Sequence, residues 1–317
     1  MTDTQNEVFK TPVNKIRLFE HGAPGSQNLK LTRKYYTEDM PDGRVKHIVQ
    51  NITAPDIVPY IPDGIGNSTD RQRIPAVLII PGGAFRRLVY NFEGEDVAKW
   101  LNSMGIAAFV LECRLPSDEH DNAEDVPLID AMRAMRVIRG RAREFGIDEA
   151  KIGVMGFSAG GFMAALLSTA YESDVYAGYK YKDEYDKLSA RPDFAVCSYP
   201  VISIDDCIEA GKRYMSEEQV LERISDSKAK ILHKYNPDKL VRPDMPPVFI
   251  CETDDDRTTL SENSVGFYMA ARKAGVSAEL HIFRTGGHGY GCGDDFAQTG
   301  EWKVLFTKWI KSIGIIS

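Results

Sequence analysis

Short apolar runs and longer segments with helical spacing alternate along the chain from residue 76 onward. Six near-continuous apolar runs predict buried strands: AVLII (76–80), IAAFVLE (106–112), KIGVMGF (151–157), FAVCSY (194–199), PVFICET (247–253) and AELHIF (278–283). Other segments predict helices over 93–104, 127–145, 159–170, 261–274 and 301–313. This alternation indicates an α/β fold, in which a mostly parallel central sheet is covered by helices on both faces.

Three stretches depart from this alternation. Residues 1–70 consist of extended pieces broken by Pro and Gly, which predicts an antiparallel edge to the sheet. Residues 171–190 and 205–246 predict cap-like insertions above the carboxyl ends of the strands, where ligands bind in such sheets. The five tyrosines of 171–190 are better explained as half-buried packing residues than as substrate contacts. Residues 1–317, which contain no internal repeat, are expected to form a single domain.

The charge of the chain argues against one class of partner. The net charge is -7 and the pI is about 5.5, and binding a phosphate backbone needs clustered Lys and Arg, so no nucleic-acid partner is expected. Five arginines between 133 and 143 lie in a predicted helix, where a solvated face or intramolecular ion pairs explain them better than RNA binding. The sequence leaves a homo-oligomer open.

Apolar content and cysteine spacing bear on the compartment. No apolar run approaches the length of about 20 residues that spans a bilayer, so no membrane partner is expected. The first fifteen residues, MTDTQNEVFKTPVNK, contain no apolar signal-peptide region. A cytoplasmic protein with reduced thiols is expected, because no C-x-x-C or zinc-ligand spacing occurs among the five cysteines, Cys113, Cys197, Cys207, Cys251 and Cys292.

The motif Gly156-Phe157-Ser158-Ala159-Gly160 carries the clearest chemical signal. It follows a predicted strand and precedes a predicted helix, which is the context of a nucleophilic serine held on a sharp strand-to-helix turn. Its hydroxyl would stand above the sheet, at the positive end of a helix. A nucleotide-binding glycine turn is a weaker alternative, because the G-x-G-x-x-G spacing and the G-K-[ST] ending are both absent.

A serine needs a base to take its proton. Six histidines are available, and only His288 lies in a glycine-rich loop, GGHGYGCG, after the last predicted strand. His288 also completes the chain order Ser, Asp, His of one known type of triad. His281 lies within a predicted strand and is expected to be structural.

The third member should be an acid that orients the imidazole and stabilises its cationic form. Asp254, Asp255 and Asp256 directly follow the predicted strand 247–253, and the residues alone leave the choice among them open. An acidic turn that caps the helix starting near 261 is the alternative explanation for two of them.

A tetrahedral oxyanion requires backbone amides that point at the developing charge. One donor should be Ala159, directly after the nucleophile. A second should come from Gly83 or Ala84, in the turn Pro81-Gly82-Gly83-Ala84-Phe85 that follows the strand 76–80.

Several stretches together carry a resemblance to a known family, among them PGGAF (81–85), NFEGEDVAKWLNSMGIAAFVLECRLP (91–116), IDEAKIGVMGFSAGG (147–161), PPVFICETDDDRTTLSENSVGFYMAARKAGV (246–276) and ELHIFRTGGHGYG (279–291). With them the chain resembles the α/β-hydrolase esterases known as acetyl-xylan or sugar-acetyl esterases, which are related to the hormone-sensitive-lipase and dienelactone-hydrolase groups. The resemblance implies the α/β-hydrolase fold, and it is more specific for the fold and the triad than for the substrate.

The resemblance also implies particular residues. Family members commonly read T-x-D-D-x-V-V-P before an ENS helix start, and this pattern, laid without a gap on TDDDRTTLSENS, puts the catalytic acid on Asp255. Family oxyanion loops often read P-G-G-G-Y, and in this chain Ala84 and Phe85 replace the last two residues of that pattern. The replacement keeps both backbone amides and narrows the space within the loop. Phe162 stands where many members have a histidine, and Phe85 and Phe162 are the expected substrate contacts.

Together these features predict a serine carboxylesterase. His288 deprotonates Ser158, which attacks an ester, and water then hydrolyses the acyl-serine; no metal or organic cofactor is expected. The resemblance favours an acetyl group and a sugar or short oligosaccharide as the alcohol. Two alternatives remain: a serine peptidase of the prolyl-oligopeptidase type, disfavoured because a long propeller-like N-terminal half is absent, and a catalytically silent binding protein on the same fold.

Overall fold

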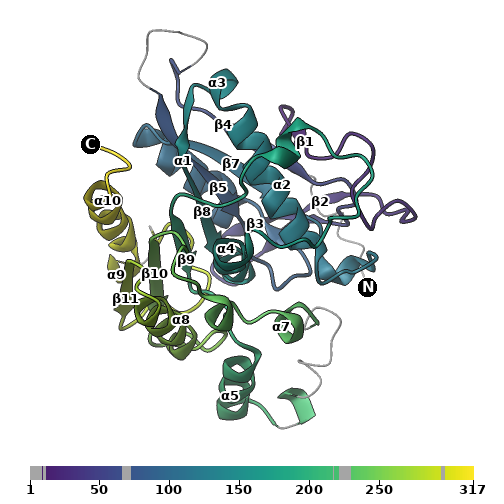
Figure 1. Cartoon of the computed structure of the whole chain (residues 1–317). Coiled ribbons are helices and arrows are strands. Elements are labelled where there is room, and N and C mark those ends of the chain that lie inside the picture. The colour runs from purple at the N-terminus through teal and green to yellow at the C-terminus, as the bar shows by residue number, and fades with distance from the viewer. Residues whose placement is uncertain (1–8, 10–11, 66–72, 217, 221–229, 294–296) are drawn as a thin grey trace.

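A computed structural model describes residues 9, 12–65, 73–216, 218–220, 230–293 and 297–317 (Figure 1). Its centre is an eight-stranded sheet in which six strands, β5 and β7 to β11, run parallel to one another. The strands are, in spatial order, β1 (Ile16–Arg17), β4 (Asp56–Tyr60), β7 (Ala107–Glu112), β5 (Ile74–Ile80), β8 (Ile147–Phe157), β9 (Ala195–Ser198), β10 (Val248–Thr253) and β11 (Ala278–Phe283). The prediction of a mostly parallel sheet is confirmed.

Helices cover both faces of this sheet (Figure 1). On one face, α1 (Asp96–Ser103) lies beside α10 (Trp302–Ser312), and Trp100 packs edge-on against Trp302 and Phe306. On the other face lie α2 (Val126–Gly140), α4 (Ala159–Ala170) and α8 (Ser261–Lys273). The strands between these layers are buried on both sides, which is why their sequences are near-continuously apolar.

The predicted helix 127–145 is interrupted in the structure. α2 ends at Gly140, and after Arg141 the chain makes one further short turn, α3 (Ala142–Phe145). Gly146 then takes a left-handed conformation, with φ 68°, as is common directly after a helix.

The described strands before residue 66 belong to two separate sheets. β4 pairs antiparallel with β7, and β1 pairs antiparallel with β4, so the predicted antiparallel edge is present. The remaining strands, β2 (Lys34–Asp39) and β3 (Val45–Gln50), join β6 (Leu88–Val89) in a second, three-stranded antiparallel sheet. The sequence did not predict this sheet, because β6 contributes only two residues and lies far from its partners in the chain.

The two insertions differ in position. Residues 171–190 pack along α2, where Arg133 forms ion pairs with Asp183 and Asp186, and Arg136 hydrogen-bonds Tyr176. This corrects the expectation that the segment stands above the carboxyl ends of the strands, because its charged side chains pair with arginines in the middle of a helix that flanks the sheet. Intramolecular partners also account for these basic side chains, as predicted.

The described part of the other insertion, 205–246, contacts the connection between β7 and α2. It contains α5 (Ile204–Tyr214), α7 (Lys230–Lys234) and the short helix η5 (Pro237–Leu240), and α5 and α7 stand apart from the helical layers in Figure 1. Lys234 and Tyr235 bind the carboxylate of Asp125, in the connection that leaves the carboxyl end of β7. Part of this stretch, 217 and 221–229, lies outside the described residues.

Two further findings concern the expectations on compartment. In the described ranges, no helix is long and apolar enough to cross a membrane. Cys113, Cys197 and Cys251 are buried free thiols and Cys292 is also buried, whereas the side chain of Cys207 lies outside the described part.

Candidate active site

Ser158 stands on a strained turn between β8 and α4. Its φ of 54° and ψ of -118° are unusual for a residue other than glycine. The neighbouring glycines permit the turn, because a Cβ on Gly156 would lie 1.9 Å from the carbonyl oxygen of Gly160, and one on Gly160 would lie 1.9 Å from that of Ile80. The predicted strand–turn–helix context of the motif is therefore confirmed.

His288 reaches this serine from the loop that follows β11. Its Nε2 lies 2.8 Å from Ser158 Oγ, and its Nδ1 lies 2.6 Å from Asp256 Oδ2. With a proton on Nδ1 facing the carboxylate, Nε2 is free to accept the serine proton. Residues 130 positions apart in the chain are thus brought into hydrogen-bond contact.

Asp256, not Asp255, is the acid that the structure places against the histidine. Asp256 is 2% exposed, whereas Asp255 is exposed and accepts a hydrogen bond from the amide of Gly287. The gapless comparison with the family pattern therefore chose a residue one position too early. β10 ends at Thr253, and the first two aspartates form the outer part of the turn before the chain bends back toward the sheet.

A set of donors holds the Asp256 carboxylate. It accepts hydrogen bonds from the amides of Thr258 (2.7 Å) and Thr259 (3.0 Å) and from the Thr259 hydroxyl (3.0 Å). Burial alone would raise the pKa of Asp256, but the bond from His288 and the backbone amides outweigh burial and lower the pKa below its usual range. Asp256 is therefore a carboxylate at neutral pH, as an acid that supports an imidazolium must be.

Two other candidates from the sequence, Asp254 for the acid and His281 for the base, do not contact Ser158 or His288 in the hydrogen bonds of the described residues. Asp254 is exposed, and the helix α8 begins without a side-chain cap, so the capping explanation for these aspartates is wrong. His281 lies in β11 and pairs with Glu279 at 2.7 Å, as expected of a structural strand histidine. 

The loop after β5, residues 81–87 and here named the oxyanion loop, passes directly beside the nucleophile. A Cβ on Gly82 would lie 2.9 Å from Ser158 Cβ. Gly83, Ala84 and Phe85 all have positive φ, at 137°, 57° and 59°, so the loop turns sharply there. Within the described ranges, the amides of Gly83 and Ala84 donate to no other protein group, which leaves both available to a ligand.

Ala159 is the first residue of α4, so its amide is one of the four that a helix leaves without an internal partner. The aromatic candidates lie next to these donors. Phe85 and Phe162 are both buried, and their rings pack edge-to-face with centroids 5.6 Å apart. A small apolar pocket next to the oxyanion loop is lined by Phe85, Leu115 and Met163, among others. Phe162 is fully buried behind Phe85 and is not among the residues that line this pocket.

Two buried residues near the site had no sequence signal. Glu93 accepts hydrogen bonds from the amide of Gly82 (2.7 Å) and from the hydroxyl of Tyr199 (2.9 Å). The Tyr199 ring lies edge-on to the imidazole of His288, with centroids 5.0 Å apart. Burial raises the pKa of Glu93, and the charge of His288 is the largest opposing influence. Glu93 is the first residue of the predicted helix 93–104, and nothing in its spacing distinguishes it from a surface glutamate.

Metal ligation was the weak alternative for the cysteines. Within the part of the chain that the structure describes, no group of three or more His, Cys, Asp or Glu side chains is arranged to hold a metal ion.

Comparison with known proteins agrees with this fold. Residues 65–270 match the BD-FAE family. An acetylxylan esterase of Xylanibacter ruminicola is 31% identical over 240 residues, which are 75% of this chain and 45% of that protein. The chain spans less than half of the length of the curated relatives that it matches.

Solved structures extend the likeness to nearly the whole chain. An acetyl ester-xyloside bifunctional hydrolase from Caldicellulosiruptor lactoaceticus superposes with a TM-score of 0.69 at 34% identity, covering 96% of this chain and 97% of its own. The carboxylesterase Cest-2923 from Lactobacillus plantarum has a TM-score of 0.67 at 20% identity over 90% of this chain and 99% of its own, which shows a shared fold. The chain thus has the α/β-hydrolase fold that these ester hydrolases share. Within that class it belongs to the BD-FAE family.

Proposed function

We propose that the protein is a serine carboxylesterase in which Ser158 is the nucleophile, His288 the general base and Asp256 the orienting acid. The observation that carries this proposal is the continuous line of contacts, 2.8 Å from serine to histidine and 2.6 Å from histidine to a buried carboxylate. Such a line is the minimal arrangement for activating a hydroxyl at neutral pH.

In the first step, the Ser158 hydroxyl gives its proton to His288 Nε2 while its oxygen attacks the ester carbonyl. The amides of Ala159 and of Gly83 or Ala84 would receive the resulting oxyanion, and one such donor typically contributes about 3–4 kcal/mol. The imidazolium returns its proton to the leaving alcohol, which leaves an acyl-serine. Water, deprotonated by the same histidine, then releases the acid and restores the serine.

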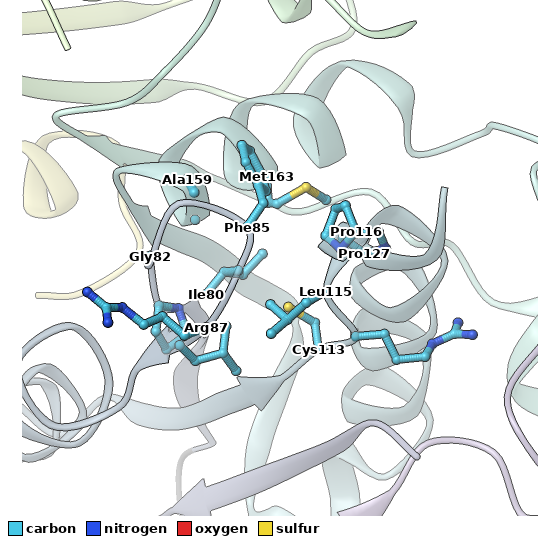
Figure 2. Close-up of a pocket in the computed structure, with 14 residues that line it drawn as sticks. Ile80, Gly82, Phe85, Arg87, Cys113, Leu115, Pro116, Pro127, Ala159 and Met163 are labelled. Carbon is cyan, nitrogen blue, oxygen red and sulfur yellow. The ribbon is translucent and has the colours of Figure 1, made fainter. Parts of the chain in front are cut away.

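The acyl group is proposed to be acetyl. A small apolar pocket lies between the oxyanion loop, the start of α4 and the connection after β7, and Figure 2 shows Phe85, Met163 and Leu115 around it. Gly82 and Ala159, which flank the nucleophile, form part of its wall. Its free space is close to that of one water molecule, so a methyl group fits and a longer chain would require side chains to move.

An acetylated sugar or short oligosaccharide is proposed as the alcohol part. This proposal rests on the relatives, one named an acetylxylan esterase and another an acetyl ester-xyloside hydrolase. The decisive comparison is the ratio of kcat/KM for acetylated xylo-oligosaccharides to that for p-nitrophenyl acetate. A ratio well above one supports a sugar alcohol, whereas a ratio far below one would leave the aryl ester as only a convenient acetyl donor.

Labelling with a fluorophosphonate probe tests the nucleophile. The wild type should be labelled and Ser158→Ala should not. Ser168→Ala is the matched control, because Ser168 lies on the same helix with its hydroxyl bonded to the Ala164 carbonyl, and labelling should be unchanged. If wild type and Ser158→Ala are labelled alike, the assignment fails; if neither is labelled, a silent binding protein becomes the better account. Hydrolysis of peptide anilides in preference to aryl acetates would favour the peptidase alternative.

The cytoplasm is the proposed compartment. Cys197 and Cys251 lie in neighbouring strands and remain free thiols, which is the usual state of cysteines in a reducing environment.

A further inference from the structure

Glu93 is a buried carboxylate whose contacts connect two loops on opposite sides of the nucleophile. It is 5% exposed and lies in a helical turn, η1 (Asn91–Glu95), directly before α1. Among the described residues no Lys or Arg forms an ion pair with it, so its charge is not matched by a neighbouring cation. A buried carboxylate is costly unless hydrogen bonds compensate its lost hydration, so its retention needs an explanation.

The first contact is to the oxyanion loop. Glu93 Oε2 accepts the amide hydrogen of Gly82 at 2.7 Å, and Gly82 lies one residue before the proposed donors Gly83 and Ala84. A side chain on Gly82 would collide with Glu93 Oε2 (2.7 Å) and with Ser158 Cβ (2.9 Å), so the loop passes close to both the carboxylate and the nucleophile. The position of Glu93 therefore fixes where the oxyanion loop stands relative to the serine.

The second contact is to the loop that holds the base, residues 284–293 and here named the histidine loop. Glu93 Oε1 accepts the hydroxyl hydrogen of Tyr199 at 2.9 Å, and the Tyr199 oxygen accepts the amide hydrogen of Gly291 at 3.1 Å. The Tyr199 ring also packs edge-on against His288. Glu93 is thus one hydrogen bond from the oxyanion loop and two from the histidine loop.

We propose that Glu93, acting through Gly82 and Tyr199, is a positioning residue that holds the oxyanion donors and the catalytic histidine at a fixed spacing around Ser158. This inference rests on the proposed function, since it assigns a role within the same reaction. Displacement of a reacting group by about 1 Å can cost on the order of 100-fold in rate, so a fixed spacing of the two loops has a measurable consequence.

Conservative substitutions separate this role from a general effect on folding. Glu93→Gln can still accept the Gly82 amide, but its NH₂ group cannot accept the Tyr199 hydroxyl hydrogen, which loses the acceptor that it has in the wild type. Tyr199→Phe keeps the ring against His288 and removes only the hydroxyl. Both changes break the link between the two loops, and each is expected to lower kcat about 10-fold while KM changes less than about 2-fold.

Tyr90→Phe is the matched control. Tyr90 is as buried as Tyr199, and its hydroxyl bonds that of Tyr60 at 3.1 Å, away from both loops. It should lose comparable thermal stability and keep wild-type kcat.

A transition-state analogue gives the readout that a purely structural role would not move. A trifluoromethyl ketone adds the Ser158 oxygen to its carbonyl carbon, transfers the serine proton to His288 and leaves an oxyanion in the hole. Its inhibition constant should rise in Glu93→Gln and Tyr199→Phe by the same factor as KM/kcat rises. Because both residues act through one connection, the double variant should lose less than the product of the single effects.

The two proposals fail in different ways. If the wild type hydrolyses no ester, the proposed function is wrong. If the wild type is active but both variants stay within about 2-fold of it, or if Tyr90→Phe loses as much kcat as Tyr199→Phe, the role of Glu93 is wrong and the triad is unaffected.

Discussion

Asp255 and Asp256 are neighbours in the chain with very different surroundings. Asp256 turns inward, where the amides of Thr258 and Thr259 and the imidazole of His288 share its two oxygens. Asp255 is exposed and accepts a hydrogen bond from the amide of Gly287. A change of one position in a turn therefore separates a carboxylate with a chemical role from one that supports a loop.

Replacing each aspartate by asparagine should give unequal effects. Asp256→Asn keeps the shape of the side chain but removes the charge that orients His288, so kcat should fall about 10³- to 10⁴-fold. Asp255→Asn should stay within about 3-fold of the wild type, since its oxygen can still accept the Gly287 amide. Steady-state hydrolysis of p-nitrophenyl acetate checks both; a larger loss in Asp255→Asn would return the acid to the position that the family pattern indicates.

Thr259 provides a second prediction at this scale. Its hydroxyl lies 3.0 Å from Asp256 Oδ2 and 3.2 Å from His288 Nδ1, so it supports the contact between acid and base from the side. Thr259→Val keeps the volume and removes that donor, and kcat should fall about 3- to 10-fold with little change in KM. Thr259→Ser, which keeps the hydroxyl, should recover most of the activity in the same assay.

The sequence identified the residues whose role depends on local context and missed those whose role depends on distant contacts. Ser158 could be found because its glycine neighbours define a turn, and His288 because it lies in a glycine-rich loop after the last strand. The choice among three adjacent acids needed the direction of each side chain. Glu93 and Tyr199 could not be found, because the loop amides that they bind, Gly82 and Gly291, lie 11 and 92 residues away from them.

Elements with strong periodicity were predicted well, and those that depend on distant pairing were not. α4 and β11 have the predicted bounds, 159–170 and 278–283. The two-residue strand β6 and the position of residues 171–190 along α2 were not predicted. Both depend on contacts with segments that are distant in the chain, β3 for β6 and α2 for residues 171–190, and no sequence motif indicates these contacts.

The close approach of α4 to β5 leads to a prediction about stability. A Cβ on Gly160 would lie 1.9 Å from the Ile80 carbonyl oxygen, so Gly160→Ala should force the helix away from the strand and cost more than about 3 kcal/mol. Gly266→Ala is the control, because Gly266 lies within α8 with no atom within 4 Å of an added Cβ. It should stabilise the protein by about 0.5–1 kcal/mol. Urea unfolding followed by circular dichroism measures both, and a neutral Gly160→Ala would contradict the packing described here.

A buried ion pair connects the N-terminal segment to the rest of the molecule. Arg114 and Asp130 are fully buried and joined at 2.7 Å, and the guanidinium also donates to Pro24 O and Ser26 Oγ. Burial raises the pKa of Asp130, and the charge of Arg114 opposes that rise. The loop at 24–26 is therefore held to the domain by a charge that has a single carboxylate partner among the described residues.

Asp130→Asn would leave the Arg114 charge buried without a counter-ion, and we expect a loss of about 3–5 kcal/mol in the free energy of unfolding. The exposed pair of Lys187 and Glu184 is the comparison, since Glu184→Gln should change that free energy by less than about 1 kcal/mol. Equal losses in the two variants, measured by urea unfolding, would show that the buried pair has no special weight.

The position of the histidine loop affects when, during folding, the molecule becomes able to hydrolyse esters. The serine turn and the acid are both encoded before β11, but the base follows that strand, at the outermost position of the sheet. A chain that has been made, or has refolded, only as far as residue 283 can form the elbow and the acid turn, yet has nothing to accept the proton. Ester turnover during refolding should therefore lag behind the recovery of helical signal and count only molecules whose final parallel strand has docked.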